Sequence, residues 1–410
     1  MAPSTDRLSS LPHSLLSTIV SLIPFKEAVR TSILSKSWID IFKSTSNIEF
    51  DEVSFVKFGQ TDQVKQAQRK AFMEFVTLWM ANHTETIVDK FSLRLSFLGK
   101  AKRVVIKCIT FATKHEVKEL ELDFSDPTFD CYFTTNYTKH DALFELPTHV
   151  YGHTSLESLK LFSCTFIETR FFNFHALKEI SLGWMEVKLN TIKTLLSNCE
   201  ALESLSLKRC WNFDDFNIGE ENLRLRKLIV DRCMFRSDSR YFIVNAPNLR
   251  YFYYSGLNND FLVMDIRSLV MEEEVLDFCI ELQEHVLFLY KLVKDISYGS
   301  TLTVCNYFLQ DYELPDNFNF ERFWIDHTRA YNCMIYALRE VEIKDFKGSM
   351  NEIRLITYFI TDGKVLRKIT INILKDDVAD QDESMDSYCR KMIETLVSQR
   401  ASRDLQISIC

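Results

Sequence analysis

The pattern apolar-x-x-apolar-x-apolar recurs along the middle of the chain. Its copies are Val117-x-x-Leu120-x-Leu122, Leu156-x-x-Leu159-x-Leu161, Leu177-x-x-Ile180-x-Leu182, Leu202-x-x-Leu205-x-Leu207, Leu225-x-x-Leu228-x-Val230 and Leu249-x-x-Phe252-x-Tyr254. From the second copy on, the central apolar positions are separated by 21, 25, 23 and 24 residues. Each copy predicts a short strand whose alternate side chains point into a shared core. No copy buries its apolar face alone, so the copies must stack.

The period is that of leucine-rich repeats. The first two copies are 39 residues apart, so residues 125–153 are predicted to form a loop insertion. The concave face of such a solenoid is the usual partner surface. The x positions of five successive copies are predicted to face outward as candidate target-binding residues: Lys160, Ser181, Ser206, Ile229 and Tyr253. Phe252 and Tyr254 are interpreted as core residues, whereas Tyr251 and Tyr253 fit either a core or a contact role.

Three cysteines share one repeat position. Cys164, Cys210 and Cys233 each lie three residues after the second strand position of the core. We interpret them as buried structural thiols, because zinc sites need ligands in close pairs. The chain has 11 Cys, with no CxxC pair and no apolar leader at its start, which favours reduced thiols in the cytoplasm and/or nucleus.

The first fifty residues predict three short helices. Ser10 is expected to cap the first helix, with Pro12 in its first turn, and Pro24 to end it. Ser35 is expected to cap a third helix that carries Trp38. The apolar stripe of the first helix, from Leu15 to Ile23, is wider than one core-facing side needs. Two interpretations are equally open from this pattern: the surplus contacts another chain, or it packs on the rest of this one.

This segment resembles a plant F-box. The matching stretches are Leu11-Pro12, Leu15-Leu16, Ile23-Pro24, residues 26–32, residues 34–36 and Trp38, whereas His13 and Ser37 depart from the family pattern. The resemblance implies docking onto a Skp-type adaptor that joins a cullin. It assigns nine residues to the docking segment: Leu8, Leu11, Pro12, Leu15, Leu16, Ile19, Ile33, Leu34 and Trp38.

Residues 51–115 are predicted to cap the solenoid. Periodicity predicts a helix over 62–82, a strand over 90–98 and a helix over 101–114. This layout is similar to that of plant F-box repeat proteins.

The last quarter predicts a helix over 274–294 and a loop over 311–330. Residues 338–373 predict a strand, a helix and a second strand. This stretch resembles the FBD domain at Val341, Ile343, Phe346, Gly348, Glu352, Leu366 and Ile369. The acidic run 376–386 is interpreted as a solvated loop.

Composition limits the remaining functions. The net charge is −8 without a long basic run, which disfavours nucleic-acid binding. The apolar stretch 15–25 is too short to span a membrane. The nine Gly are too far apart for a phosphate-binding loop, and no HExxH motif occurs. We therefore expect no catalytic residues, no metal site and no cofactor.

The sequence predicts an α/β protein with an N-terminal three-helix F-box, a leucine-rich-repeat solenoid and a C-terminal FBD-like α+β segment. The expected boundaries are 1–50, 51–115 for the cap, 116–335 for the repeats and 336–410. The resemblance implies a non-catalytic, substrate-recruiting subunit of an SCF-type ubiquitin ligase that binds a target protein. The alternative is a repeat receptor or scaffold that binds a small ligand or a protein without ligase function.

Overall fold

The structure is a computed structural model, and its contacts divide the chain into two compact units. Unit 1 comprises residues 1–186 and 194–202, and unit 2 comprises residues 187–193 and 203–410. The described residues are 8, 10–57, 59–83, 87–96, 98, 101–125, 143–167, 174–219, 223–236, 239–256, 263–278, 300–305, 332–348, 350–373, 398 and 400–410.

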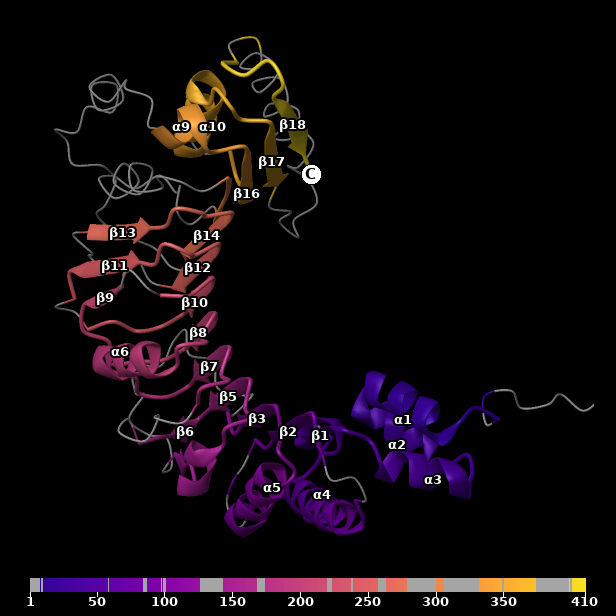
Figure 1. The fold of residues 1–410 in the computed structure, drawn as a ribbon. Helices are drawn as coiled ribbons and strands as arrows, with labels where there is room; N and C mark the ends of the chain where they lie inside the picture. Colours follow the sequence, from indigo (N-terminus) through magenta and orange to yellow (C-terminus); the bar gives the residue numbers. More distant parts are fainter. Residues whose placement is uncertain are drawn as a thin grey trace, which may run out of the picture. The chain divides into compact units, whose positions relative to one another are not determined.

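Unit 1 begins with three short helices (Figure 1), which are α1 (His13–Leu22), α2 (Phe25–Thr31) and α3 (Lys36–Lys43). Helices α1 and α2 each begin after a proline. Pro12 and Pro24 are their N-cap residues, and the fixed φ of proline suits the start of a helix. The prediction that Ser10 caps α1 is therefore wrong. Ser35 is the N-cap of α3, as predicted, although its side chain makes no capping hydrogen bond.

A parallel sheet follows in unit 1. Its strand order is β1 (Asn47–Asp51), β2 (Lys90–Arg94), β3 (Glu119–Asp123), β5 (Ser158–Phe162) and β7 (Glu179–Gly183). The central apolar residues pair in one row, namely Ile48, Phe91, Leu120, Leu159 and Ile180. The ladder therefore starts at residue 47, well before the predicted first repeat. Each strand is short because only two of its side chains enter the core.

Helices α4 (Asp62–Asn82) and α5 (Lys102–Lys114) agree with the predictions for 62–82 and 101–114. The strand predicted over 90–98 is shorter and ends at Arg94. Part of the predicted insertion 125–153 lies outside the described residues. Its described end holds β4 (Phe144–Glu145), paired with β6 (Cys164–Thr165), and the 3-10 helix η4 (Thr148–Gly152). A second short 3-10 helix, η1 (Glu52–Ser54), follows β1.

Rings from the helices and the sheet share one core in unit 1. Trp79 of α4 lies 5.6 Å from Phe25 of α2, 5.9 Å from Phe42 of α3 and 5.5 Å from Phe50 of β1, measured between ring centroids. Such pairs add stability beyond their buried area. The N-terminal helices are therefore packed onto the start of the repeat sheet.

Unit 2 continues the repeat pattern. Its parallel strands are β8 (Ser204–Lys208), β10 (Lys227–Asp231), β12 (Tyr251–Gly256), β14 (Glu273–Phe278), β15 (Thr301–Cys305), β16 (Glu340–Phe346), β17 (Lys368–Ile373) and β18 (Gln406–Ile409). Helix α6 (Leu189–Asn198) is divided between the two units. All six predicted repeat strands are present in the two units.

A second, three-stranded sheet lies across the core of unit 2 (Figure 1). It consists of β9 (Phe216–Gly219), β11 (Tyr241–Asn245) and β13 (Val263–Arg267). Phenylalanines pack beside it: the buried Phe216 and Phe242 stack with centroids 4.7 Å apart, and the buried Phe213 lies 5.3 Å from the half-buried Phe235. This packing accounts for part of the chain's high phenylalanine content.

The helix predicted over 274–294 is wrong at its start, because residues 273–278 form β14. Glu274 occupies the central position that an apolar residue holds in the other copies, and it pairs with Phe252 of β12. Because Glu274 is charged, the repeat pattern was not recognised in this stretch of the sequence. In the structure Glu274 is nevertheless buried, and Leu276 takes the second core position. Residues 279–294 and the loop predicted over 311–330 lie outside the described residues, as does the acidic run 376–386.

A left-handed residue follows the strand in several repeats. Ser163, Trp184, Arg209 and Arg232 have φ between 51° and 54°. The backbone N–H of Arg209 donates to the Asp231 carbonyl of the next repeat at 2.7 Å. The turn directs the following residue inward, and Cys164, Cys210 and Cys233 lie there as buried free thiols, as predicted. Burial raises the pKa of Cys164 and Cys233, which keeps these thiols protonated and inert.

The C-terminal part of unit 2 has the predicted strand, helix and strand, with α10 (Met350–Asp362) between β16 and β17 and α9 (Asn332–Tyr336) before them. Glu352 is fully buried near the start of α10 and accepts the backbone N–H of Lys347 at 3.1 Å. Within the described residues, no helix combines the length and apolarity that crossing a membrane requires.

Candidate functional site

Helix α1 has three different sides. Leu16 and Val20 face the core and are buried. Ser14, Ser17, Thr18 and Ser21 form a hydroxyl stripe one third of a turn away. The third side carries Leu15, Ile19 and Leu22, which recur at helical spacing and are all exposed. An apolar stripe in solvent is the expected signature of a surface that a partner covers.

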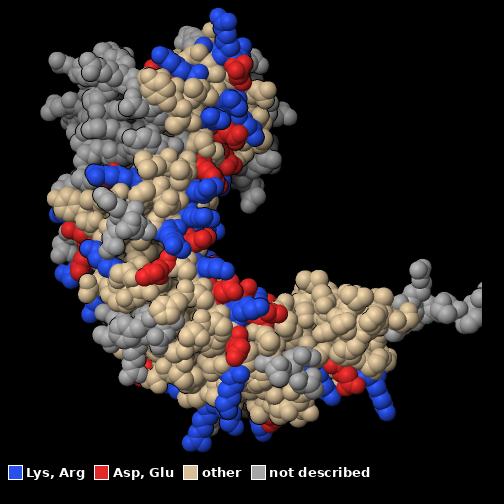
Figure 2. All heavy atoms as spheres, viewed as in Figure 1, with Lys and Arg blue, Asp and Glu red and all other residues tan. Residues whose placement is uncertain are grey.

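Exposed apolar side chains continue beyond α1. Ile33 is 83% exposed and Leu34 is 69% exposed in the turn after α2, and Leu8 before α1 and Ile39 of α3 are also exposed. We call this set the docking face: Leu8, Leu15, Ile19, Leu22, Ile33, Leu34 and Ile39. In the view of Figure 2, the upper part of the N-terminal helices shows no charged side chains, which gather along the lower edge. Helix α1 itself contains no Lys, Arg, Asp or Glu.

The nine residues predicted for docking divide into two groups. Leu8, Pro12, Leu15, Ile19, Ile33 and Leu34 are exposed, and Leu11 is partly exposed. Leu16 and Trp38 are each only 4% exposed and lie in the core, so their place among the docking residues stays a prediction. The motif marks apolar positions without distinguishing the two sides of a helix. Helical spacing separates them, since Leu16 and Val20 are four residues apart on the side opposite Leu22.

Leu22 and Ile39 were not predicted for docking. Leu22 is 79% exposed and lies seven residues after Leu15 on the same stripe. Extending the Leu15–Ile19 spacing by one helical step identifies it from sequence. Ile39 follows the buried Trp38 directly, and the adjacent-residue geometry of a helix points it to a different side.

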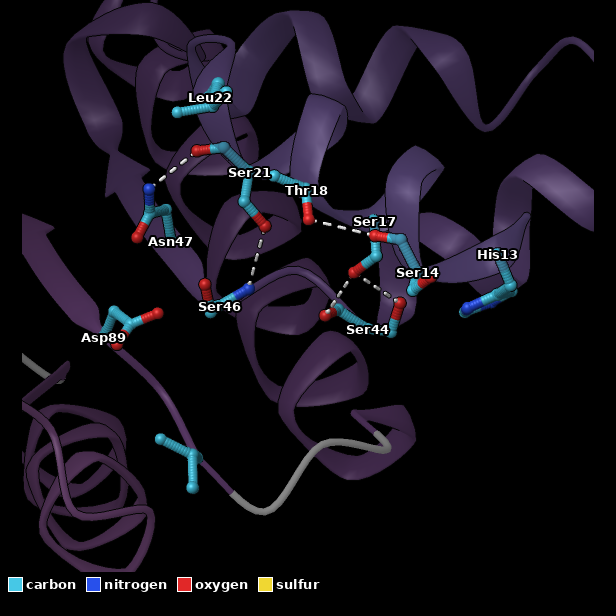
Figure 3. Close-up of a pocket in the computed structure, with 11 residues that line it drawn as sticks. His13, Ser14, Ser17, Thr18, Ser21, Leu22, Ser44, Ser46, Asn47 and Asp89 are labelled. Carbon is cyan, nitrogen blue, oxygen red and sulfur yellow. Dashed lines mark hydrogen bonds between the residues drawn. The ribbon is translucent and has the colours of Figure 1, made fainter. Parts of the chain in front are cut away.

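A pocket of about 610 Å³ lies beside the hydroxyl stripe. Figure 3 shows its walls, which come from α1, the segment 44–47 and the residues before β2. The polar groups largely bond to one another. Ser17 Oγ donates to the Ser44 carbonyl at 3.2 Å, the Ser46 N–H donates to Ser21 Oγ at 3.3 Å and Asn47 Nδ2 donates to the Ser21 carbonyl at 2.6 Å.

These bonds give the pocket a structural role. They hold α1 against the turn that leads from α3 into β1, which fixes the docking face relative to the first strand. The hydrogen bond from Lys118, at 2.8 Å, holds the pKa of the Asp89 carboxyl at the pocket edge below its usual value. A small ligand would meet groups whose hydrogen bonds are already made, so the pocket does not favour the small-ligand alternative.

The predicted target-binding residues lie on the side of the repeat strands that points away from the core. In unit 1, Lys160 pairs with Ser181 in register. In unit 2, Ser206 pairs with Ile229, and Ile229 pairs with Tyr253. The structure therefore brings the residues together within each unit, as a row along neighbouring strands.

Their exposure differs. Lys160, Ile229 and Tyr253 are half-buried, and Lys160 Nζ lies 3.6 Å from a carboxylate oxygen of Glu179. Ser181 and Ser206 are only 5% exposed, because their short side chains lie below those of their neighbours. These two serines offer a partner little contact area. Among the described residues, no group of three or more His, Cys, Asp or Glu is arranged to hold a metal ion.

A stacked parallel repeat sheet with an exposed apolar helix face is typical of repeat proteins that bind partners. Models of three domains match the chain: an F-box domain over residues 8–49, the At1g61320/AtMIF1 leucine-rich-repeat domain over 79–293 and FBD over 331–371.

Curated proteins of Arabidopsis thaliana are similar to it. The putative F-box protein At3g29830 is 34% identical over 74% of this chain and 66% of its own length. The putative F-box/LRR-repeat protein At1g56400 is 32% identical over 84% of this chain and 70% of its own length, and the F-box protein At3g62230 is 28% identical over 90% and 91%. The chain thus spans just under two thirds of the first of these relatives. It belongs to the plant F-box/leucine-rich-repeat family, with an F-box, repeats and an FBD region.

Proposed function

We propose that the chain is a substrate-recruiting subunit of an SCF-type ubiquitin ligase. The docking face binds a Skp-type adaptor, which joins a cullin, and the repeat strands bind a target protein. The observation that carries the proposal is the docking face itself. Seven large apolar side chains lie exposed on a small helical segment whose other apolar residues, such as Phe25 and Trp38, are buried.

The role is non-catalytic. The chain holds the ligase core at one end and a target along its repeats, so a target lysine meets activated ubiquitin at high effective concentration. Packing of Trp79 against Phe25 and Phe50 supports this role, because a firm joint between the helices and the sheet limits the volume that the bound target explores. Bond formation belongs to other subunits.

The test is reconstitution with a purified Skp-type adaptor and the N-terminal half of a cullin. We expect the full chain to co-elute with both in size-exclusion chromatography. The double variant Leu15→Asp, Ile19→Asp should elute alone while its circular dichroism spectrum stays unchanged. A folded wild-type chain that elutes apart from the adaptor would reject the ligase role and leave a repeat scaffold.

A further inference from the structure

An aromatic patch lies on the solvent side of the unit 2 sheet. Tyr251 and Tyr253 point outward from β12, and Ile229 of β10 pairs directly with Tyr253. All three side chains are half-buried. We call these residues the tyrosine patch. In unit 2, the other residues in the row of Tyr253 are small or polar, apart from Val275, whose side chain is buried. They are Ser206, Val275, Thr303, Glu342, Thr370 and Ser408.

Neighbouring side chains hold both rings in place. The Tyr253 hydroxyl donates to Asp277 Oδ2 at 3.3 Å, and Ser255 Oγ donates to the same oxygen at 3.2 Å. The ammonium of Lys227 lies 5.2 Å from the centroid of the Tyr251 ring. Tyrosines fixed in this way lose little conformational entropy when a partner binds. Tyrosine is also enriched among residues that dominate interface energies.

Ion pairs line one edge of the patch, at the positions just before the strands. Arg226 lies 3.6 Å from Glu203, and Arg250 lies 2.8 Å from Glu272. Apolar contacts bordered by polar residues are typical of protein interfaces, where the polar rim keeps water from the central contacts. The patch is therefore suited to an apolar side chain of a protein partner.

Charge is unequal on the two sides of the patch. Toward β14 and β16, four carboxylates stand at outward positions of the sheet: Glu273, Asp277, Glu340 and Glu342. Lys344 of β16 lies beside them, and Lys368 of β17 pairs with Glu340. Toward β8 and β10 lie Lys208 and Lys227, and Asp231 is 3.7 Å from Arg232. A partner segment over β14–β16 meets mainly negative charge. Opposite charges in the partner are favoured there, and like charges are penalised.

Strand spacing sets the length of the segment. Neighbouring strands lie about 4.8 Å apart, so β12 and β16, three strands apart, are roughly 14 Å from each other. An extended chain covers that distance in about four residues. We propose that the target segment packs an apolar side chain on the tyrosine patch and places lysine or arginine about four residues away, over the carboxylates of β14 and β16.

This inference rests on the proposed function and specifies the target's chemistry. The probe is a phage-displayed library of random 12-residue peptides, selected against the full chain. We expect enriched peptides to combine an aromatic or aliphatic residue with Lys or Arg about four positions away. Their binding should weaken at least tenfold in Tyr253→Ser and in the double variant Glu273→Lys, Glu340→Lys.

Tyr241→Ser is the matched control, because Tyr241 is an exposed tyrosine of β11 on the other sheet of unit 2. It should leave peptide binding unchanged. Selection of acidic peptides, absence of any consensus, or equal binding by Tyr253→Ser would overturn the inference. Adaptor binding of the same variants is measured separately, so failure here with intact adaptor binding rejects the target chemistry alone. Loss of adaptor binding by the wild-type chain rejects the ligase role instead. If Tyr253→Ser fails to fold, the surface charge variant still decides the question.

Discussion

Trp79 of α4 packs edge-on against Phe25 of α2, with ring centroids 5.6 Å apart and ring planes at 75°. Trp79 also contacts Phe42 and Phe50, so it joins two N-terminal helices to the first strand. The F-box is thereby fused to the repeat sheet through a common core. In the proposed ligase role, this contact would restrict the positions in which a bound target is presented.

Replacing Trp79 tests whether the N-terminal helices and the first strand share one core. Trp79→Ala removes a buried aromatic side chain and should lower the free energy of unfolding by about 3–5 kcal/mol. Leu78→Ala is the control, because Leu78 is exposed on the same helix and should change the value by less than about 0.5 kcal/mol. Urea unfolding followed by circular dichroism measures both. Equal stabilities for the two variants would contradict the shared core.

The hydrogen bonds between α1 and residues 44–47 give a second prediction, on stability. Ser21 Oγ accepts from the Ser46 N–H and lies 3.2 Å from Thr45 Oγ1. Ser21→Ala should therefore destabilise the chain by about 1–2 kcal/mol, since the buried Thr45 and the half-buried Ser46 each lose a hydrogen-bond partner. Ser14→Ala, on the same stripe, should be nearly neutral, because Ser14 is exposed. Thermal unfolding of the two variants decides whether the hydrogen bonds between α1 and residues 44–47 contribute to stability.

Acidification should destabilise unit 1 through His83. Burial, together with nearby His115, lowers the pKa of His83 to about 4. The unfolded chain binds a proton near pH 6.5 and the folded chain does not, so stability falls as pH drops from 6.5 toward 4. We expect the urea midpoint to fall less between pH 7.5 and 5.5 in His83→Gln than in the wild type. An equal fall in both would assign the pH dependence to other groups.

Two glycines provide a matched backbone test. A Cβ added at Gly219 would lie 2.5 Å from Asn245 Cβ and 2.6 Å from the Asn245 carbonyl oxygen, and φ is +157°. Gly219→Ala should cost about 1–3 kcal/mol, the range for overpacking. Gly152→Ala should not destabilise, because no atom lies within 4 Å of its Cβ position. Similar melting temperatures for the two variants would contradict the close approach of β9 and β11.

Local patterns predicted those parts of the fold in which a regular apolar spacing is intact. Helices α4 and α5 and the strands β3, β5, β7, β8, β10 and β12 follow such patterns. Strand β14 was missed because Glu274 replaces the central apolar residue, and burial of a carboxylate there depends on contacts that sequence spacing does not report. Strands β9, β11 and β13 pair across more than twenty residues, so their pairing is a tertiary property.

The docking site was predicted as a segment but not as a surface. Resemblance assigned docking to α1 and to the turn at Ile33 and Leu34, and it also included the buried Leu16 and Trp38. Which side of a short helix stays exposed depends on where neighbouring helices pack, and α1 is covered on the side of Leu16 and Val20. The exposed side is therefore known only after the packing of α2 and α3 is known.

Titration of the purified Skp-type adaptor into matched surface variants tests the central claim most directly. Leu34 and Leu78 are 69% and 66% exposed, but only Leu34 belongs to the docking face. Aspartate at either position should leave the fold intact. We predict that Leu34→Asp weakens adaptor binding at least tenfold, whereas Leu78→Asp binds like the wild type. Equal binding by Leu34→Asp and Leu78→Asp would contradict the assignment of this face to the adaptor.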